Sequence, residues 1–249
     1  MTKENQQSRI AIVIGASGGI GSAISSVLLE QGISVTGIST GTSHPIPKIQ
    51  QHTCYSHQAI QLANPLKRRV AFSEIARQRP LVSAVFFAAG VPAFGKLDNI
   101  SAPQTDSALE VNLKSVIDCA RLLKPSLQKH ASLTSQPGSM IVFGSEADSL
   151  PGVEGAIYCA TKFGLRGLIE SLRPEWSRDN LRISLISPGA VRTPFYEKTY
   201  FAPGPSDDNA LSAFQCAKAA MFCMEFPTPG GIDQIRMSPK TRVFKKGSH

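Results

Sequence analysis

The chain has 249 residues, of which 42% are hydrophobic and 18% charged, a balance typical of a folded globular protein and not of a disordered chain. Lys and Arg outnumber Asp and Glu by 26 to 18, which gives a net charge of +8. Because no recognition-helix motif or basic stripe interleaved with aromatic residues accompanies this excess, we expect no nucleic-acid partner. An acidic carrier protein stays open as a partner.

Residues 1–9 are polar, and no apolar run approaches the roughly 20 residues of a membrane span. This pattern predicts a cytoplasmic protein without a membrane anchor. The cysteines show no CxxC pair, and the histidines at 44, 52 and 57 are irregularly spaced, so we expect reduced thiols and no metal site. Residues 247–249 have the sequence of an expression-tag remnant.

The N-terminal part predicts a strand, a helix and a second strand. Residues 10–14 are a compact apolar run, a glycine-rich turn follows, and residues 20–31 carry apolar side chains at helical spacing. The second strand is expected at residues 33–38. Little periodicity follows, and a short third strand is expected at residues 53–55.

The rest of the chain alternates between strands and helices. Further strands are expected at 82–88, 140–143, 182–186 and, at the sheet edge, 232–237. Further helices are expected at 64–77, 104–129, 156–177 and, capped by Ser206, 206–225. This alternation predicts one domain over residues 1–246, a Rossmann-type, doubly wound parallel α/β sheet of about seven strands with helices on both faces.

The glycine-rich turn after the first strand lies where a backbone must approach a phosphate closely and where helix N–H groups stay free to bind it. Tight turns also use glycine for its backbone freedom alone, so the turn by itself is a weak sign. The residues that we assign to a dinucleotide here are Gly15, Ser17, Gly18, Gly19, Ile20 and Gly21.

Tyr158 and Lys162 are four residues apart on a predicted helix and therefore lie on one face of it. A free tyrosine has a pKa of roughly 10, and a nearby ammonium favours the phenolate, which makes the tyrosine a better acid/base near neutral pH. An amphipathic surface pair is the alternative explanation of the same spacing.

The glycines at 15, 19 and 21 follow a GxxxGxG pattern, and residues 158–162 read Y-C-A-T-K, a YxxxK pattern. With these motifs, the sequence from about residue 10 to residue 193 resembles the short-chain dehydrogenase/reductase family. The resemblance is in particular to its carbonyl and ketoacyl reductases and its serine-dehydrogenase-like members. The resemblance implies an NAD(P)-dependent oxidoreductase that interconverts a ketone or aldehyde and an alcohol. The catalytic residues that it implies are Asn112, Ser145, Tyr158 and Lys162.

The resemblance also gives each of these residues a role. Tyr158 is the acid/base, Ser145 orients the substrate carbonyl, Lys162 holds the nicotinamide ribose and Asn112 supports a proton-relay water. The cofactor-binding residues implied outside the glycine-rich turn are Ala89, Gly90, Tyr158, Lys162, Pro188, Gly189, Val191 and Thr193.

The end of the second strand bears on the choice of cofactor, because a carboxylate there binds an NAD ribose and a basic group accommodates the 2′-phosphate of NADP. Ser39 and Thr40 occupy this place. Without an acidic residue there, nothing repels the 2′-phosphate, and the hydroxyls of Ser39 and Thr40 can donate hydrogen bonds to it. NADP(H) is therefore favoured over NAD(H). Ser56 or His57 is expected where the family has an adenine-binding Asp.

Residues 195–210 are expected to form a lid over the substrate, a small carbonyl compound or alcohol. Aromatic rings there either line an apolar pocket or pack the lid onto the body. The expected substrate-side residues are Phe94, Glu146, Phe195, Tyr196 and Tyr200. The family also implies a homodimer or homotetramer, although the V-D-G-G segment near the family's usual C-terminus is absent.

Two other functions stay open. One is a nucleotide-binding regulator that turns over no substrate. The other is a non-redox enzyme that uses Tyr158 for dehydration, isomerisation or cyclisation. A change in nicotinamide absorbance during turnover separates the redox reaction from both.

Overall fold

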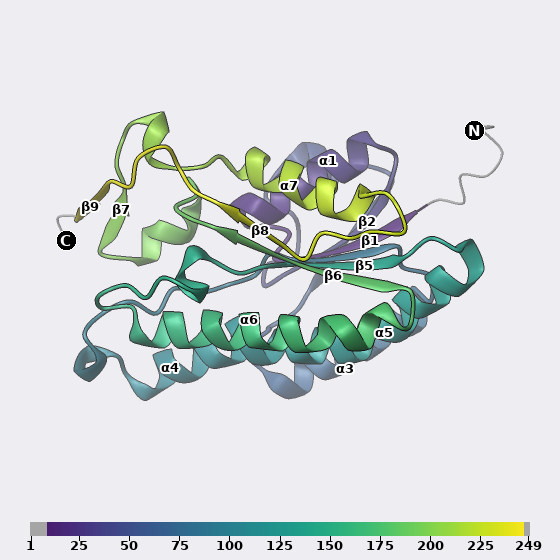
Figure 1. The fold of residues 1–249 in the computed structure, drawn as a ribbon, viewed down its shortest axis with the longest axis horizontal. Coiled ribbons are helices and arrows are strands. Elements are labelled where there is room, and N and C mark those ends of the chain that lie inside the picture. The colour runs from purple at the N-terminus through teal and green to yellow at the C-terminus, as the bar shows by residue number, and fades with distance from the viewer. Residues whose placement is uncertain (1–8, 247–249) are drawn as a thin grey trace.

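A seven-stranded parallel sheet runs through the centre of the computed structural model, which describes residues 9–246 (Figure 1). Its strands lie in the order β3-β2-β1-β4-β5-β6-β8, and each neighbouring pair is parallel. The strands are β1 (Ile10–Ile14), β2 (Ser34–Ser39), β3 (Tyr55–Ala59), β4 (Ala84–Phe87), β5 (Gly138–Phe143), β6 (Leu181–Pro188) and β8 (Gln234–Met237). This arrangement confirms the expected Rossmann-type sheet, whose strand order reverses between β1 and β4. Residues 247–249 lie outside the described part.

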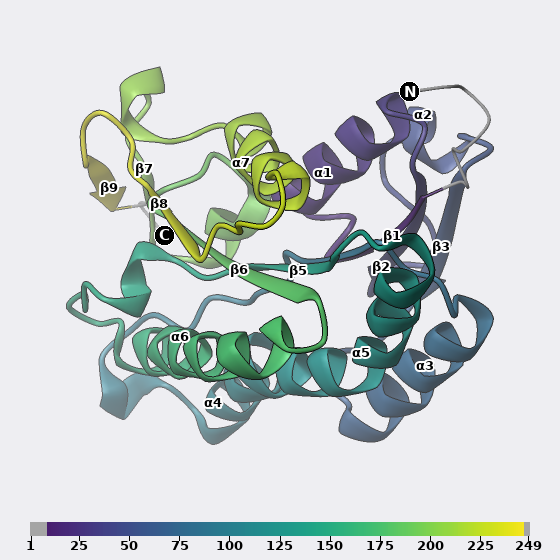
Figure 2. The same ribbon diagram turned by 45° about the vertical axis from the view of Figure 1, so that its right-hand side comes forward.

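Helices cover both faces of the sheet. α1 and α7 lie together on one face, and α3, α4, α5 and α6 lie on the other (Figures 1 and 2). The helices are α1 (Gly19–Glu30), α2 (Pro47–Gln50), α3 (Pro65–Gln78), α4 (Ala102–Leu109), α5 (Ser115–Thr134), α6 (Ala156–Ser177) and α7 (Ala213–Glu225). Within residues 9–246, each helix is too short or too polar to span a membrane.

The central strands are apolar on both sides because helices cover both faces. In β1, Ile12 and Ile14 belong to the core beneath α3, α5 and α6, whereas Ala11 and Val13 belong to the core beneath α1 and α7. All four are 0% exposed, and burial of a large apolar side chain contributes about 1.5–3 kcal/mol. An unbroken apolar run therefore forms a strand that faces two cores.

The third strand begins later than predicted. β3 runs from Tyr55 to Ala59, so residues 53 and 54 of the expected strand lie outside it. Its polar side chains find partners on the neighbouring strand, as Ser56 Oγ does 3.2 Å from Thr36 Oγ1. Such cross-strand bonds allow an edge strand without an apolar run.

The helix predicted over 206–225 is wrong in its first part. Ser206 caps only the short 3-10 turn η6 (Asp207–Asn209). α7 is a separate helix that begins after the capping box of Ser212. Between them, the Leu211 amide donates to the carbonyl of Ala190 at 2.8 Å. This contact with a distant segment keeps the chain extended where local sequence favours a helix.

The helix predicted over 104–129 is interrupted by a π-helical turn, η3 (Glu110–Lys114), which separates α4 from α5. π-turns of this kind occur often at functional sites. Asn112 lies in this turn and is buried.

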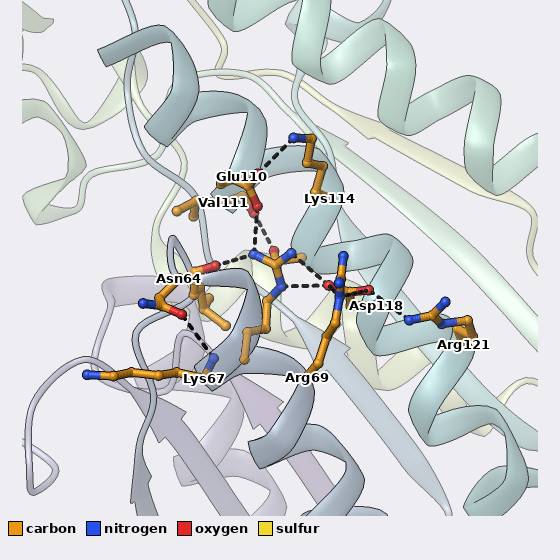
Figure 3. Close-up of polar contacts among 11 residues, drawn as sticks. Asn64, Lys67, Arg69, Glu110, Val111, Lys114, Asp118 and Arg121 are labelled. Atoms are coloured by element: carbon orange, nitrogen blue, oxygen red, sulfur yellow. Dashed lines mark hydrogen bonds and ion pairs between the residues drawn. The ribbon is translucent and has the colours of Figure 1, made fainter. Parts of the chain in front are cut away.

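A buried arginine fastens the π-helical turn to α3 (Figure 3). Arg68 is 0% exposed, and its guanidinium donates to Asp118 of α5 at 2.7 and 2.9 Å, to Glu110 at 3.0 Å and to the carbonyl of Leu62. Burial opposes ionisation of Glu110, but hydrogen bonds from Lys114 and Arg68 outweigh it and lower the pKa of that carboxyl. The network thus joins α3, α5, η3 and the turn after β3.

Arg68→Met should lower the free energy of unfolding by about 3–5 kcal/mol, because it leaves the buried Asp118 carboxylate without its closest cation. Arg69→Met is the matched control. Arg69 also pairs with Asp118, at 3.2 Å, but its side chain is 55% exposed, so its loss should cost about 1 kcal/mol or less. Chemical denaturation measures the free energy of unfolding of both variants. Equal losses would show that burial of the Arg68–Asp118 pair does not set its contribution to stability.

Candidate active site

The glycine-rich turn joins the carboxyl end of β1 to α1 and packs tightly on its surroundings. The amides of Gly15 and Ala16 both donate to the carbonyl of Ile38 in β2, at 2.8 and 3.0 Å. Gly15 has a φ of +84°, and a Cβ built on it would lie 2.6 Å from the amide nitrogen of Ala89. A Cβ built on Gly21 would lie 2.1 Å from the carbonyl oxygen of Gly15. The turn therefore requires glycine at these two positions.

The first turn of α1 offers free backbone donors at the carboxyl end of the sheet. Gly18 is the N-cap and no acidic side chain follows in the first helical turn, so the N–H groups there have no intrahelical partner and no competing carboxylate. A Cβ on Gly19 would lie 2.5 Å from Thr193 Cγ2. This cradle of backbone donors and close-packed glycine fits the pyrophosphate of a dinucleotide.

A pocket of about 330 Å³ opens beside this cradle, at the carboxyl ends of the central strands. Among the residues expected to form the site, those that line it are Gly18, Gly19, Ile20, Ala89, Gly90, Ser145, Tyr158, Lys162, Pro188, Gly189, Val191, Thr193, Phe195 and Tyr196. The lining residues that the sequence did not single out are Ala88, Val91, Pro92, Phe143, Gly144, Pro194, Glu197 and Lys198. One pocket thus brings together segments from distant parts of the chain.

Helix α6 carries Tyr158 and Lys162 into this pocket. Both are buried, with 7% and 4% of their surface exposed. The Lys162 ammonium lies 5.6 Å from the centroid of the Tyr158 ring and donates to the carbonyl of Phe143 at 3.2 Å. Ser145, at the end of β5, accepts a hydrogen bond from the Ala147 amide at 3.2 Å, which fixes its hydroxyl on the pocket side.

The protonation of this pair follows from its surroundings. Burial raises the pKa of Tyr158, contrary to the lowering expected from the neighbouring ammonium, and a hydrogen bond with Ser145 opposes part of the rise. Burial lowers the pKa of Lys162 to about 8, although the charge of Asp148 raises it. At pH 7 the pocket therefore holds a protonated phenol beside an ammonium, which is an arrangement able to donate a proton.

Asn112 reaches the same place from the π-helical turn without lining the pocket itself. Its Oδ1 accepts from the Val91 amide at 2.8 Å and its Nδ2 donates to the Val91 carbonyl at 3.0 Å. A Cβ built on Gly90 would lie 3.5 Å from Asn112 Oδ1 and 3.9 Å from Lys162 Nζ. The asparagine and the lysine thus converge on the backbone of Gly90.

The structure places three expected substrate-side residues behind the pocket lining. Phe94 stacks on Tyr158 with ring centroids 4.7 Å apart, the Tyr200 hydroxyl donates to Glu154, and Glu146 pairs with an arginine of the C-terminal segment at 3.0 Å. Gly15, Ser17, Gly21, Ser39 and Thr40 also lie outside the lining.

At the end of β2, the Ser39 hydroxyl lies 3.1 Å from Nε2 of His57, which is 2.9 Å from the carbonyl of Gly41. Thr40 is exposed. Ser56 and His57 lie within β3, whereas ligands of such sheets bind beyond the carboxyl ends of the strands. Gln61, which follows β3 and is exposed, stands nearer to that place.

The segment 195–210 consists of a 3-10 turn, η5 (Pro194–Lys198), the short strand β7 (Phe201–Pro203) and η6. β7 pairs antiparallel with a C-terminal strand that the sequence did not predict, β9 (Phe244–Lys246). Phe201 packs against both Phe94 and Phe244, at centroid distances of 5.0 and 5.5 Å. The C-terminal strand thus covers this segment from outside.

Asp148 is a residue of the site that the sequence did not reveal. It ends the 3-10 turn η4 (Glu146–Asp148), which begins directly after Ser145, and it is 0% exposed. Its Oδ2 accepts a hydrogen bond from Ser187 Oγ of β6. No local pattern marks this residue because its partners come from other elements.

Among residues 9–246, no cluster of three or more His, Cys, Asp or Glu side chains that could hold a metal ion is present.

Comparison with known proteins shows similarity over most of the chain. The short chain dehydrogenase family model matches residues 9–201. An uncharacterized oxidoreductase of Staphylococcus epidermidis is 25% identical over 233 residues, which cover 93% of this chain and 97% of that protein. An alcohol dehydrogenase from the archaeon Thermococcus sibiricus, solved with 5-hydroxy-NADP, has a TM-score of 0.82 at 21% identity and covers 94% of this chain and 98% of its own. A 3-ketoacyl-(acyl-carrier-protein) reductase from Brucella melitensis, solved with NADH, has a TM-score of 0.79 at 16% identity, with coverage of 92% and 96%.

Gly19→Ala should weaken binding of NADPH by at least about tenfold, since the new methyl group would meet Thr193 Cγ2 and push the helix terminus out of place. Fluorescence titration of NADPH measures this. The double variant Gly19→Ala with Thr193→Ser removes the opposing methyl and should recover part of the affinity. Unchanged affinity in the single variant would rule out this cradle as the phosphate site.

Proposed function

This chain belongs to the short-chain dehydrogenase family, and from that membership we propose that it is an NAD(P)-dependent oxidoreductase that interconverts a ketone or aldehyde and an alcohol. The observation that carries the proposal is the pocket in which Tyr158, Lys162 and Ser145 meet next to the glycine-rich turn. Phosphate-binding backbone and an acid/base pair in one pocket are what hydride transfer with proton transfer requires.

The protein residues divide the work of the reduction. A bound nicotinamide supplies the hydride. Ser145 donates a hydrogen bond to the carbonyl oxygen and stabilises the negative charge that develops there, while Tyr158 gives that oxygen a proton. The Lys162 ammonium stabilises the resulting phenolate and holds the nicotinamide ribose. Asn112 supports the water through which the site is reprotonated.

The cofactor is held by the segments that surround the pocket. The N-terminus of α1 would bind the pyrophosphate, the backbone of Ala89 and Gly90 would contact the cofactor between α1 and Lys162, and the backbone of 188–193 would hold the nicotinamide end. We favour NADP(H), because β2 ends at Ser39 and Thr40 and has no carboxylate there to repel a 2′-phosphate. The solved relatives named above carry 5-hydroxy-NADP in one case and NADH in the other.

The substrate is a small carbonyl compound that enters beneath the lid formed by residues 195–210. Phe195 and Tyr196 offer aromatic surface on the lid side of the pocket, which suits an apolar substrate. The net charge of +8 leaves a carrier protein with acidic groups as a further partner. We further propose a cytoplasmic homodimer or homotetramer, as is usual for the family.

Tyr158→Phe should reduce the rate of carbonyl-dependent NADPH oxidation by about 10³-fold or more, since it removes the proton donor. The dissociation constant of NADPH should change by no more than about twofold, because the ring and its packing stay. Stopped-flow absorbance and fluorescence titration give the two values. Retained turnover would eliminate Tyr158 as the acid, and product formation without any absorbance change would favour a non-redox reaction.

Ser39→Asp should shift cofactor preference toward NADH. The new carboxylate would repel the 2′-phosphate of NADPH and accept hydrogen bonds from the ribose of NADH. The ratio of kcat/KM for the two cofactors should change by about tenfold or more, while Ser39→Asn, which adds the same volume without charge, should change it far less. A ratio unchanged by the aspartate would place the 2′ position elsewhere.

A further inference from the structure

A buried carboxylate next to the catalytic pair has no task in the reaction described so far. Asp148 is 0% exposed, and within residues 9–246 its Oδ1 has no hydrogen-bond partner. Its Oδ2 accepts from Ser187 Oγ, and its amide donates to the carbonyl of Ser145 at 2.9 Å. A neutral hydroxyl compensates a buried negative charge only in part, so a cation close by would stabilise the carboxylate further.

Helix α6 packs on η4. It carries two cations on which the charge of Asp148 acts, namely Lys162 and Arg166. Arg166 is already paired, since its Nε lies 2.7 Å from Glu170 Oε1 and its side chain is 35% exposed. Lys162 is the buried one, with 4% of its surface exposed. Lys162 is therefore the buried cation on which the Asp148 charge acts, across a distance longer than that of a direct ion pair.

The backbone of Phe143 and Gly144 is flanked by both groups. Lys162 Nζ donates to the carbonyl of Phe143, the residue directly before Gly144, at 3.2 Å. A Cβ built on Gly144 would lie 3.0 Å from Asp148 Oδ2. A side chain at 144 would thus press on the carboxylate, and glycine leaves room for it beside the pocket.

We propose that Asp148 is a positioning residue of the active site, whose buried carboxylate keeps Lys162 in its charged form and through Lys162 assists Tyr158. The role of Asp148 in catalysis rests on the proposed function, whereas the electrostatic coupling between Asp148 and Lys162 does not. The groups that face Asp148 are Tyr158, Lys162 and Arg166 of α6 and Ser187 of β6.

The direction of the coupling favours reduction. The Asp148 charge raises the pKa of Lys162 and also that of Tyr158. The first effect keeps the ammonium charged and the second keeps the phenol protonated as pH rises. When the Asp148 charge is removed, the decline of carbonyl-reduction activity at alkaline pH should therefore begin at a lower pH.

Asp148→Asn tests the coupling with little change of shape. In the full cofactor-free chain, the ¹³Cε NMR signal of Lys162 reports its titration, whose midpoint should fall below the wild-type pKa of about 8 by about one unit. Glu170→Gln, which removes a carboxylate from the exposed side of α6, should leave the midpoint in place. An unchanged midpoint in Asp148→Asn would overturn the proposal.

Ser187→Ala separates charge from local packing, because it removes the hydrogen bond to Asp148 but keeps the carboxylate. Its Lys162 midpoint should not fall as that of Asp148→Asn does, and an equal fall would assign the effect to disturbed structure and overturn the proposal. The pH profile of kcat should shift in the same direction as the NMR midpoint. Wild-type protein that oxidises no NADPH with any carbonyl substrate would refute the proposed function, while the NMR comparison would still decide the coupling.

Discussion

The site depends on keeping one ammonium charged inside the protein. Lys162 lies where solvent barely reaches, and burial alone favours its neutral form. The structure opposes this with a backbone carbonyl from the end of β5 and a carboxylate from η4. The same elements present the Ser145 hydroxyl, so the charge, the hydroxyl and the phenol are fixed by one junction of β5, η4 and α6.

The parallel sheet explains why this junction lies beside a phosphate cradle. Because all strands of the sheet are parallel, their carboxyl ends lie at the same edge. The turn after β1, the loop after β4 and the ends of β5 and β6 therefore surround a common pocket. Close packing then leaves no room for side chains, since a Cβ on Gly15 would meet the backbone of Ala89 and one on Gly19 would meet Thr193. The Arg68 network holds the π-helical turn that contains Asn112, because Arg68 donates to Glu110 in that turn.

Features set by local patterns could be predicted from the sequence, as the apolar run of β1 and the one-turn spacing of Tyr158 and Lys162 show. Features that depend on distant partners could not. β3 begins later than its sequence indicates because β2 supplies partners for its polar side chains, and the break before α7 arises from the hydrogen bond between Leu211 and Ala190. The role of Asp148 was invisible for the same reason, since its partners lie on other elements.

The central claim is that hydride passes between a nicotinamide and a carbonyl carbon in the pocket of Tyr158 and Lys162. The most direct measurement incubates the protein with NADPH carrying two deuterium atoms at C4 and a panel of aromatic ketones, aliphatic ketones and β-ketoacyl thioesters, followed by mass spectrometry of the alcohols. The account predicts one deuterium on the carbinol carbon of at least one product. Products without deuterium, or a panel that leaves the bound cofactor unoxidised, would contradict it.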